Sequence, residues 1–299
     1  MSISRELYSL YSLLDDPQAS VQKAVRDRIL LLGEDCIASL RELTEVHGNQ
    51  HRDLVEELVT EVRMRAVLRR LVGYAVDASV VDLEEGAFAI AKFGYPETSV
   101  DAYRSRLDEM AADIRVLAGV RAAPLDTFMK MRSYLFSDLG FLGNREDYYN
   151  PNNSFLTKVI DYRKGIPITL SVLMLLLGKR LGLVLNGIGM PMHFLVQYDD
   201  GSRMFFVDAF NSGIIITRDQ CRLMLSSSGI KLKPEMLSPV LPRDIMERMW
   251  RNLYLAYQQQ GDETEASRVA EIISFINPDF KVNNTMEEDT DEGEDDDFS

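Results

Sequence analysis

The sequence has few of the residues that build disulfide-linked or metal-binding folds. Its 299 residues include two cysteines, three histidines and one tryptophan. The two thiols, Cys36 and Cys221, do not make a disulfide framework, and we expect both to be reduced. Three histidines without ligand-spaced cysteines or aspartates do not predict a metal site. We therefore predict no metal and no cofactor.

Long apolar runs and a basic surface are missing as well. The most apolar stretch, Leu170 to Leu177, is interrupted by Ser171 and is too short to cross a bilayer. The N-terminus has no basic region followed by an apolar one, as a secretory signal would. Lys and Arg number 33 against 47 Asp and Glu, and no basic stripe is visible. We predict a cytoplasmic protein that binds neither a membrane nor nucleic acid.

The acidic excess is concentrated at the C-terminus. The formal net charge is −14, and the segment 286–299 holds nine of the acids and no base. Such a segment repels itself and contains too little apolar surface to fold. We predict a disordered acidic tail over residues 282–299 that serves solubility, with docking to a basic partner as the alternative.

The pattern along the chain predicts an α+β protein in three folded parts. Apolar residues at three- and four-residue spacing predict helices through the N-terminal half, and residues 1–75 resemble a HEAT-type repeat around the turn at Asp15-Asp16-Pro17. In the central region, residues 76–240, the period changes to that of strands after Gly182. Residues 193–198 and 204–210 should form an antiparallel hairpin across Asp199-Asp200-Gly201-Ser202.

The region 241–281 is expected to be a helical pair. Trp250, Leu253, Tyr257, Ala266 and Pro278 lie at the spacing of a tetratricopeptide repeat, although Tyr254 occupies a position where that repeat has a small residue. A single pair of this kind should pack on the core. Further upstream, Ser154 is a candidate N-cap for a helix over residues 155–162.

The central region also carries most of a thiol-hydrolase site. Such a site needs a nucleophile at a helix N-terminus, a His that takes its proton and a carboxylate that orients the His. Gly165-Ile166-Pro167 begins a helix, with Pro at its first position. His193 and Asp208 lie near the same end of the predicted hairpin, so contact between them is expected. The helix start, however, carries no cysteine.

Five segments of this region resemble the transglutaminase-like superfamily, and more narrowly its SirB-type branch. They are L-E-E-G-A-F-A-I-A-K-F-G-Y-P (Leu83 to Pro96), N-P-N-N-S-F-L (Asn150 to Leu156), R-K-G-I-P-I-T-L-S-V-L (Arg163 to Leu173), G-M-P-M-H-F-L-V (Gly189 to Val196) and V-D-A-F-N-S-G (Val207 to Gly213). The resemblance implies a papain-like core in which a helix packs on an antiparallel sheet. It places the catalytic His at His193 and the catalytic Asp at Asp208. The catalytic Cys position, counted from Gly165, falls on Pro167.

Three hypotheses follow for function. The favoured one is a non-catalytic protein that acts as a binding or regulatory scaffold for a protein or peptide partner. Its candidate binding residues are Arg163, Gly165, Pro167 and Asn211, although Arg163 also fits a solvated helix end.

The second hypothesis is a hydrolase or acyl transferase that uses Ser171 or Thr169 as nucleophile with His193 and Asp208. In the third and weakest hypothesis, His193 and Asp208 bind a metal.

Overall fold

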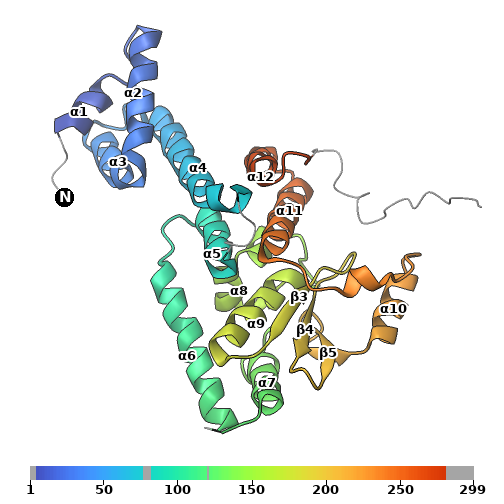
Figure 1. The fold of residues 1–299 in the computed structure, drawn as a ribbon. Coiled ribbons are helices and arrows are strands. Elements are labelled where there is room, and N and C mark those ends of the chain that lie inside the picture. Colours follow the sequence, from blue (N-terminus) through green and yellow to red (C-terminus); the bar gives the residue numbers. More distant parts are fainter. Residues whose placement is uncertain (1–4, 77–81, 120, 281–299) are drawn as a thin grey trace, which may run out of the picture. The chain divides into compact units, whose positions relative to one another are not determined.

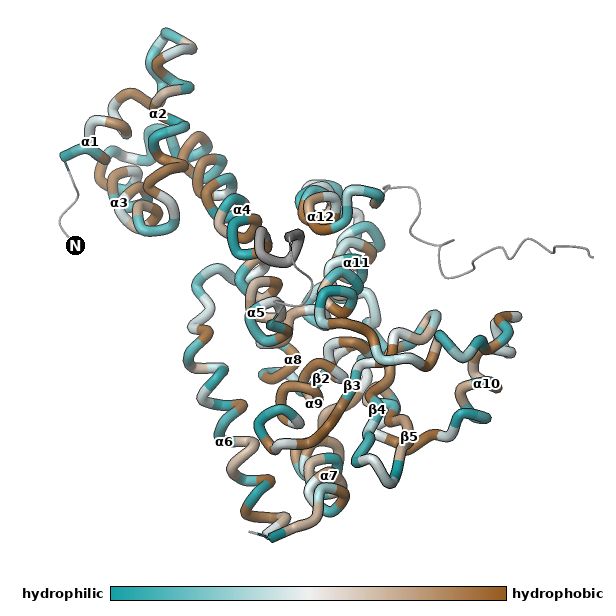
Figure 2. Tube along the Cα trace, in the orientation of Figure 1, coloured by the Kyte–Doolittle hydropathy of each residue, from teal (hydrophilic) through white to brown (hydrophobic). Residues whose placement is uncertain are grey.

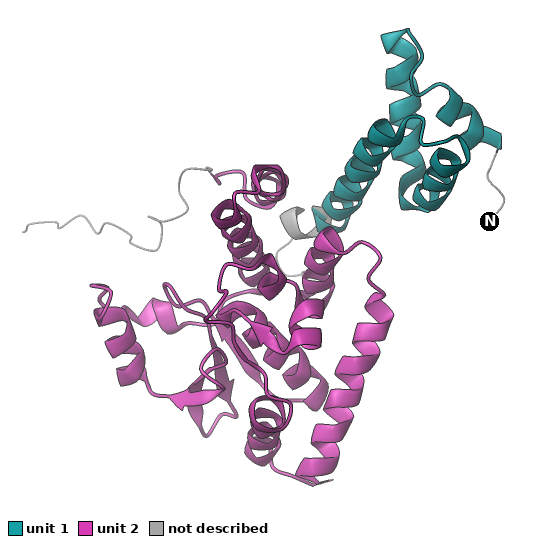
Figure 3. Ribbon diagram, turned by 180° about the vertical axis from the view of Figure 1, so that it is seen from behind, with its two compact units in different colours: residues 1–72 teal, residues 73–299 magenta. Residues whose placement is uncertain are grey.

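The computed structural model describes residues 5–76, 82–119 and 121–280. The chain divides into two compact units, residues 1–72 and residues 73–299 (Figure 3). Within the described ranges, strands occur only in the second unit and helices occur in both. This confirms the predicted α+β class. The acidic tail predicted for residues 282–299 lies outside the described residues.

The first unit is a group of amphipathic helices around one apolar core. Its elements are α1 (Arg5–Ser12), α2 (Ala19–Leu32), the 3-10 helix η1 (Gly33–Cys36), α3 (Ile37–Val46) and most of α4 (Arg52–Val76). Tyr11, Ile29, Leu40 and Val62 each contribute to the buried cluster from a different helix. Cys36 lies in the same cluster.

The second unit begins with helices that surround a buried central helix. They are α5 (Leu83–Gly94), α6 (Val100–Ala118), α7 (Pro124–Ser133), the π-helix η3 (Tyr134–Asp138), the 3-10 helix η4 (Pro151–Ser154), α8 (Leu156–Tyr162) and the central helix α9 (Pro167–Leu181). Residues 167–178 of α9 are all buried. A helix that is apolar on every side is stable only in a core, and α9 appears as an apolar segment inside the unit (Figure 2).

The start of α8 differs from the prediction by one residue. Phe155, not Ser154, is the N-cap, and it provides no side-chain cap. The predicted cap was wrong because Pro151–Ser154 winds into η4, which has its own cap in Asn150. The side chain of Asn150 accepts a hydrogen bond from the backbone N–H of Asn152 at 2.9 Å.

A four-stranded antiparallel sheet follows α9, in the order β3 (Leu185–Ile188), β4 (Leu195–Asp199), β5 (Met204–Asp208) and β6 (Ile214–Ile216). Val196 pairs with Val207 and Asp199 with Met204, which confirms the predicted hairpin. Both strands are shorter than predicted at the end that carries His193 and Asp208, because the chain turns there on each side. The helix α9 packs on β3 and β4 (Figure 1).

A second, two-stranded pairing holds the start of α9. The short strands β1 (Leu142–Gly143) and β2 (Lys164–Gly165) run parallel, with Gly143 opposite Gly165. Gly165 is buried, and a Cβ there would lie 3.1 Å from a methyl group of Val159. Glycine thus allows β2 to pass directly beneath α8 before α9 begins.

The unit ends in α10 (Arg218–Ser226), the 3-10 helix η5 (Pro234–Leu237), α11 (Pro242–Gln260) and α12 (Glu263–Ile276). Gly261, at φ 73°, makes the turn between α11 and α12. The ring of Trp250 packs edge-on against Phe93 of α5, with centroids 5.5 Å apart. The pair therefore packs on the core of its own unit. No helix in the described ranges has the length and apolar character needed to span a membrane.

Candidate functional site

The first position of α9 carries no nucleophile. Pro167 is the first helical residue, and the N-cap residue Ile166 has an extended backbone and no capping side chain. Pro167 is buried. Proline suits this position because the first N–H of a helix has no intrahelical partner. Pro167 therefore stabilises the helix start and offers no reactive group.

The two hydroxyl groups proposed as alternatives have different environments. Thr169 donates its hydroxyl hydrogen to the backbone carbonyl of Asn153 at 2.7 Å and is fully buried. Ser171 is also fully buried, and its Oγ has no hydrogen-bond partner among the described residues. Thr169 thus ties α9 to η4, whereas Ser171 is a buried hydroxyl without a structural role of this kind.

His193 and Asp208 lie together, as the predicted hairpin requires. His193 Nε2 is 2.9 Å from Asp208 Oδ2, and the two side chains are 12% and 1% exposed. The ring N–H is not well directed at the oxygen, so the close contact is mainly electrostatic. Because Nε2 faces the carboxylate, Nδ1 is the ring nitrogen left for a proton-accepting role. Nδ1 makes no hydrogen bond within the described part of the chain.

The Asp208 carboxylate is fixed from its other side by Asn211. Oδ1 accepts the backbone N–H of Asn211 at 3.0 Å, and Oδ2 accepts its side-chain N–H at 2.6 Å. Burial alone would raise the pKa of Asp208, but the contact with His193 and the two bonds from Asn211 outweigh burial and lower it. Asp208 is therefore a buried carboxylate held in its ionised form.

Arg145 extends this chain of contacts toward the surface. Its Nη2 donates to Asn211 Oδ1, and its guanidinium lies 5.1 Å from the centroid of the Phe210 ring. Phe210 in turn faces His193 edge-on at 6.4 Å and Tyr148 at 5.9 Å. An ordered series of groups thus runs from Arg145 through Asn211 and Asp208 to His193.

Gly143 permits the approach that brings Arg145 and Phe210 together. A Cβ at Gly143 would lie 2.4 Å from Cδ2 of Phe210 and 2.6 Å from its backbone oxygen. Only a residue without a side chain fits here, so β1 can pass directly against the turn that follows β5.

A second arginine holds the loop that precedes His193. Arg248 of α11 donates from Nη2 to the backbone carbonyls of Met190 and His193, each at 3.0 Å. Within this loop the N–H of His193 donates to the carbonyl of Met190 at 3.1 Å, and Met192 has a left-handed backbone with φ 59°. The position of His193 therefore depends on a helix far along the chain.

Left-handed residues flank each part of the site. Arg163 precedes β2 with φ 58°, Met192 precedes His193, and Ser212 follows Asn211 with φ 57°. Non-glycine residues in this region cost energy and persist only where the surrounding contacts fix them. The backbone before His193, after Asn211 and before β2 is thus tightly determined.

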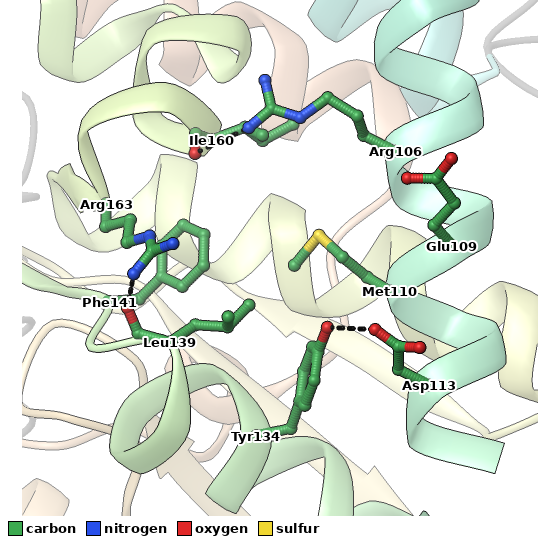
Figure 4. Close-up of a pocket in the computed structure, with 9 residues that line it drawn as sticks. All are labelled: Arg106, Glu109, Met110, Asp113, Tyr134, Leu139, Phe141, Ile160 and Arg163. Carbon is green, nitrogen blue, oxygen red and sulfur yellow. Dashed lines mark hydrogen bonds between the residues drawn. The ribbon is translucent and has the colours of Figure 1, made fainter. Parts of the chain in front are cut away.

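The predicted residues do not all gather in one place. His193, Asp208 and Asn211 form one cluster, whereas Arg163 lines a separate pocket and donates to the carbonyl of Leu139 at 2.8 Å (Figure 4). Pro167 and Gly165 lie at the start of α9. That Pro167 faces the His–Asp pair remains a prediction.

The described residues offer few other reactive groups near the pair. Cys221 packs in the core behind the sheet, where burial and the charge of Asp208 raise the pKa of its thiol. A raised pKa opposes thiolate formation. The described ranges contain no group of three or more His, Cys, Asp or Glu side chains that could hold a metal ion.

Sequence reasoning missed Gly143, Arg145, Tyr148 and Arg248. Gly143 ends β1, and Arg145 and Tyr148 lie on the loop between β1 and η4. The path of this segment depends on the β1–β2 pairing, which two residues per strand cannot signal. Arg248 belongs to α11, 55 residues after His193. No local pattern connects a helical arginine to a backbone carbonyl so far away.

Comparison with known proteins matches residues 101–251 to a family model described as the transglutaminase-like superfamily. The chain is 30% identical to a UPF0162 protein of Xylella fastidiosa (strain Temecula1) over 210 residues, which are 68% of this chain and 74% of the relative. A UPF0162 protein of Vibrio cholerae is 30% identical over 206 residues, 68% of this chain and 76% of the relative.

Human F-box only protein 21 is 30% identical over 139 residues, which are 44% of this chain and 22% of that protein. No solved structure gives a significant match. The matched residues 101–251 contain the start of α9, the His–Asp pair and Asn211. The chain belongs to the transglutaminase-like superfamily.

Proposed function

We propose that the chain is a non-catalytic transglutaminase-like protein of the SirB-type branch, acting as a binding or regulatory scaffold for a protein or peptide partner. The observation that carries the proposal is Pro167 at the first position of α9. A thiol hydrolase needs its sulfur at this helix end, where the dipole stabilises the thiolate. Proline offers no atom that can attack a carbonyl.

The neighbouring groups support the same conclusion. Thr169 donates its proton to a backbone carbonyl, so transferring that proton to a base would break a buried hydrogen bond. The His–Asp pair is held by Asn211, Arg145 and Arg248 through contacts that need no nucleophile. A buried imidazole and carboxylate satisfy each other whether or not they catalyse a reaction.

The helical parts fit a scaffold. The pair α11–α12 is interpreted as tetratricopeptide-like, with its characteristic positions Trp250 and Leu253 fully buried, and the helices of the first unit as HEAT-like. Both repeat types present helical surfaces to proteins or peptides. The buried, unpaired thiols of Cys36 and Cys221 agree with the reducing conditions of the cytoplasm.

A specific observation favours one second candidate, a hydrolase or acyl transferase that uses Ser171. The Oγ of Ser171 has no hydrogen-bond partner among the described residues, although buried hydroxyls are usually paired. Ser171 also lies one helical turn after Pro167, on the same face of α9.

Labelling with mechanism-based probes separates the two candidates. Wild-type protein and His193→Ala are treated with a fluorophosphonate and with a panel of activated acyl esters. The proposal expects equal, background-level labelling and hydrolysis for both. Pro167→Cys serves as the positive control, because a thiol at the start of α9 should gain reactivity toward iodoacetamide at neutral pH.

Hydrolysis by the wild-type protein that Ser171→Ala or Thr169→Ala abolishes would refute the non-catalytic proposal. Cys221→Ala is the matched control, because it removes a buried nucleophilic atom that lies behind the sheet. Circular dichroism of each variant shows whether a loss of activity reflects unfolding.

A further inference from the structure

The turn that follows β5, residues 211–213, packs against the end of α7 and the π-helix η3. Arg132 of α7 donates from Nη1 to the backbone carbonyl of Gly213 at 3.1 Å. The ring of Phe136 in η3 lies so close to Gly213 that a Cβ at this glycine would be 2.3 Å from its Cδ2. Gly213 is buried and has a left-handed backbone with φ 66°. The two side chains therefore fix the position of the turn 211–213.

This turn in its place holds the Asp208 carboxylate. The backbone N–H and the side-chain N–H of Asn211 both donate to Asp208, at 3.0 Å and 2.6 Å. The carboxylate oxygen Oδ2 is in turn 2.9 Å from Nε2 of His193. An electrostatic contact depends on the distance between its groups, so a displacement of the turn would change the environment of the His193 ring.

The π-helix η3 (Tyr134–Asp138) is a rare element with a closely related alternative. The N–H of Leu139 donates to the carbonyl of Tyr134 at 2.9 Å, five residues back. Such a turn holds one residue more than an α-helical turn, and single π-turns are frequent at functional sites. In the α-helical register the same carbonyl would accept from Asp138 instead. A slip of one residue is thus enough to rearrange η3.

The opposite side of η3 lines a pocket of about 180 Å³ between α6, η3 and the end of α8 (Figure 4). Tyr134 and Leu139, at the two ends of η3, line this pocket, and Phe136 does not. The Tyr134 hydroxyl donates to Asp113 of α6 at 2.8 Å, and the Leu139 carbonyl accepts from Arg163 at 2.8 Å. Helical residues two positions apart do not share a face, so η3 presents Tyr134 to the pocket and Phe136 to the turn 211–213.

We propose that η3 is a conformational relay between this pocket and the His–Asp pair. A change in the contacts of η3 at the pocket moves Phe136 and displaces the turn 211–213. The displaced turn alters the contact of Asp208 with His193. The relay does not need the pair to catalyse a reaction, so it goes beyond the scaffold role and gives the occupancy of one site an effect on another.

Nuclear magnetic resonance of the full chain tests the relay with two readouts. The first is the imidazole Cε1–H signal of His193, which is the single histidine of the second unit and is assigned with His193→Ala. The second is hydrogen exchange at the backbone amide of Asn211, which donates to Asp208. Both readouts are recorded at constant pH, so a change in either reports the surroundings of the pair.

Tyr134→Ala perturbs η3 from the pocket side, by removing a half-buried ring and its bond to Asp113. It should shift the His193 signal and speed exchange at Asn211 about threefold to tenfold. Tyr103→Ala is the matched control. It also removes a half-buried ring and a hydroxyl bond, to Asp161 at 2.7 Å, but it lies on α6 and should leave both readouts unchanged.

Phe136→Ala and Arg132→Met perturb the turn side, and each should change both readouts in the same direction. Arg132→Lys keeps a donor and should restore most of the effect of Arg132→Met. Unchanged readouts in Phe136→Ala and Arg132→Met would overturn the proposal, as would changes confined to these two variants, or equal changes in Tyr134→Ala and Tyr103→Ala. If Tyr134→Ala does not fold, Tyr134→Phe repeats the test against Tyr103→Phe, with a smaller effect in the same direction expected and no effect overturning the relay.

Discussion

Replacing Asp208 by Asn should destabilise the second unit, because it keeps the shape of a buried side chain and removes its acceptor capacity. Oδ2 accepts from Asn211 at 2.6 Å and lies 2.9 Å from His193 Nε2, and Oδ1 accepts the N–H of Asn211. The amide that replaces the carboxylate has only one acceptor oxygen. Its NH₂ group therefore points at a donor, either an N–H of Asn211 or the ring of His193. A buried polar group left unpaired costs about 1–3 kcal/mol. We expect a loss of that size in the free energy of unfolding.

The loss should depend on pH with a defined sign. The folded state lowers the pKa of Asp208, because the contacts with His193 and Asn211 outweigh the opposing effect of burial. A carboxyl group with a lowered folded pKa stabilises the fold above its unfolded pKa of about 3.9, and that contribution is lost as the pH falls through the folded value. The difference between wild type and Asp208→Asn should therefore persist at pH 7 and shrink below about pH 4.

Tryptophan fluorescence provides the assay. The single tryptophan, Trp250, is fully buried in the second unit, so its emission reports the unfolding of this unit in urea. For a unit of this size, a loss of 1–3 kcal/mol should lower the melting temperature by roughly 2–12 °C. Asp219→Asn is the matched control, because Asp219 is 78% exposed and its ion pair with Arg222 contributes little.

A stability of Asp208→Asn within about 0.5 kcal/mol of the wild type would refute this reasoning, because changes of that size are ordinary for surface sites. So would a loss that stays unchanged as the pH falls well below about 3.9, since the ionised form of Asp208 would then be no more stabilising than the protonated form.

Two other substitutions test the supports of the site. Gly143→Ala should destabilise the second unit by about 1–3 kcal/mol, because the new Cβ would overlap the ring and backbone oxygen of Phe210. Gly189→Ala should cost clearly less, because its Cβ would lie 3.2 Å from a methyl group of Val240 and 3.6 Å from Nη1 of Arg248, without overlap. Arg248→Met removes the donor to the carbonyls of Met190 and His193, so hydrogen exchange at the amide of His193 should become faster. Arg251→Met, on the same helix, should leave that exchange rate unchanged. Equal exchange rates in the two variants would show that Arg248 does not hold the loop.

The local parts of this site could be predicted from the sequence. The β-prone runs on either side of the D-D-G-S turn predict the β4–β5 hairpin, and counting from that turn brings His193 to Asp208. Pro167 marks the start of α9 because its ring suits only the first helical position. Each of these inferences depends on residues that are close in the sequence.

The supports of the site could not be predicted in this way. Arg145 reaches Asn211 across 66 positions, and its place depends on how tightly Gly143 packs on Phe210. The hydrogen bond of Thr169 to Asn153 depends on the path of η4, which also made the predicted cap at Ser154 wrong. Such contacts follow from tertiary packing, which local propensity does not encode.

The same Asp208→Asn change has different meanings in two backgrounds. In the wild-type chain no nucleophile stands at the start of α9, so the change should affect stability and leave turnover at background. In Pro167→Cys a thiol stands at that helix end, and Asp208 would act on it by orienting His193, as the carboxylate of a Cys–His–Asp triad does. Adding Asp208→Asn to Pro167→Cys should then slow iodoacetamide labelling at neutral pH, at a temperature where both proteins are folded. An unchanged labelling rate would mean that the His–Asp pair does not act on the start of α9, and that its role is confined to holding the turn through Asn211.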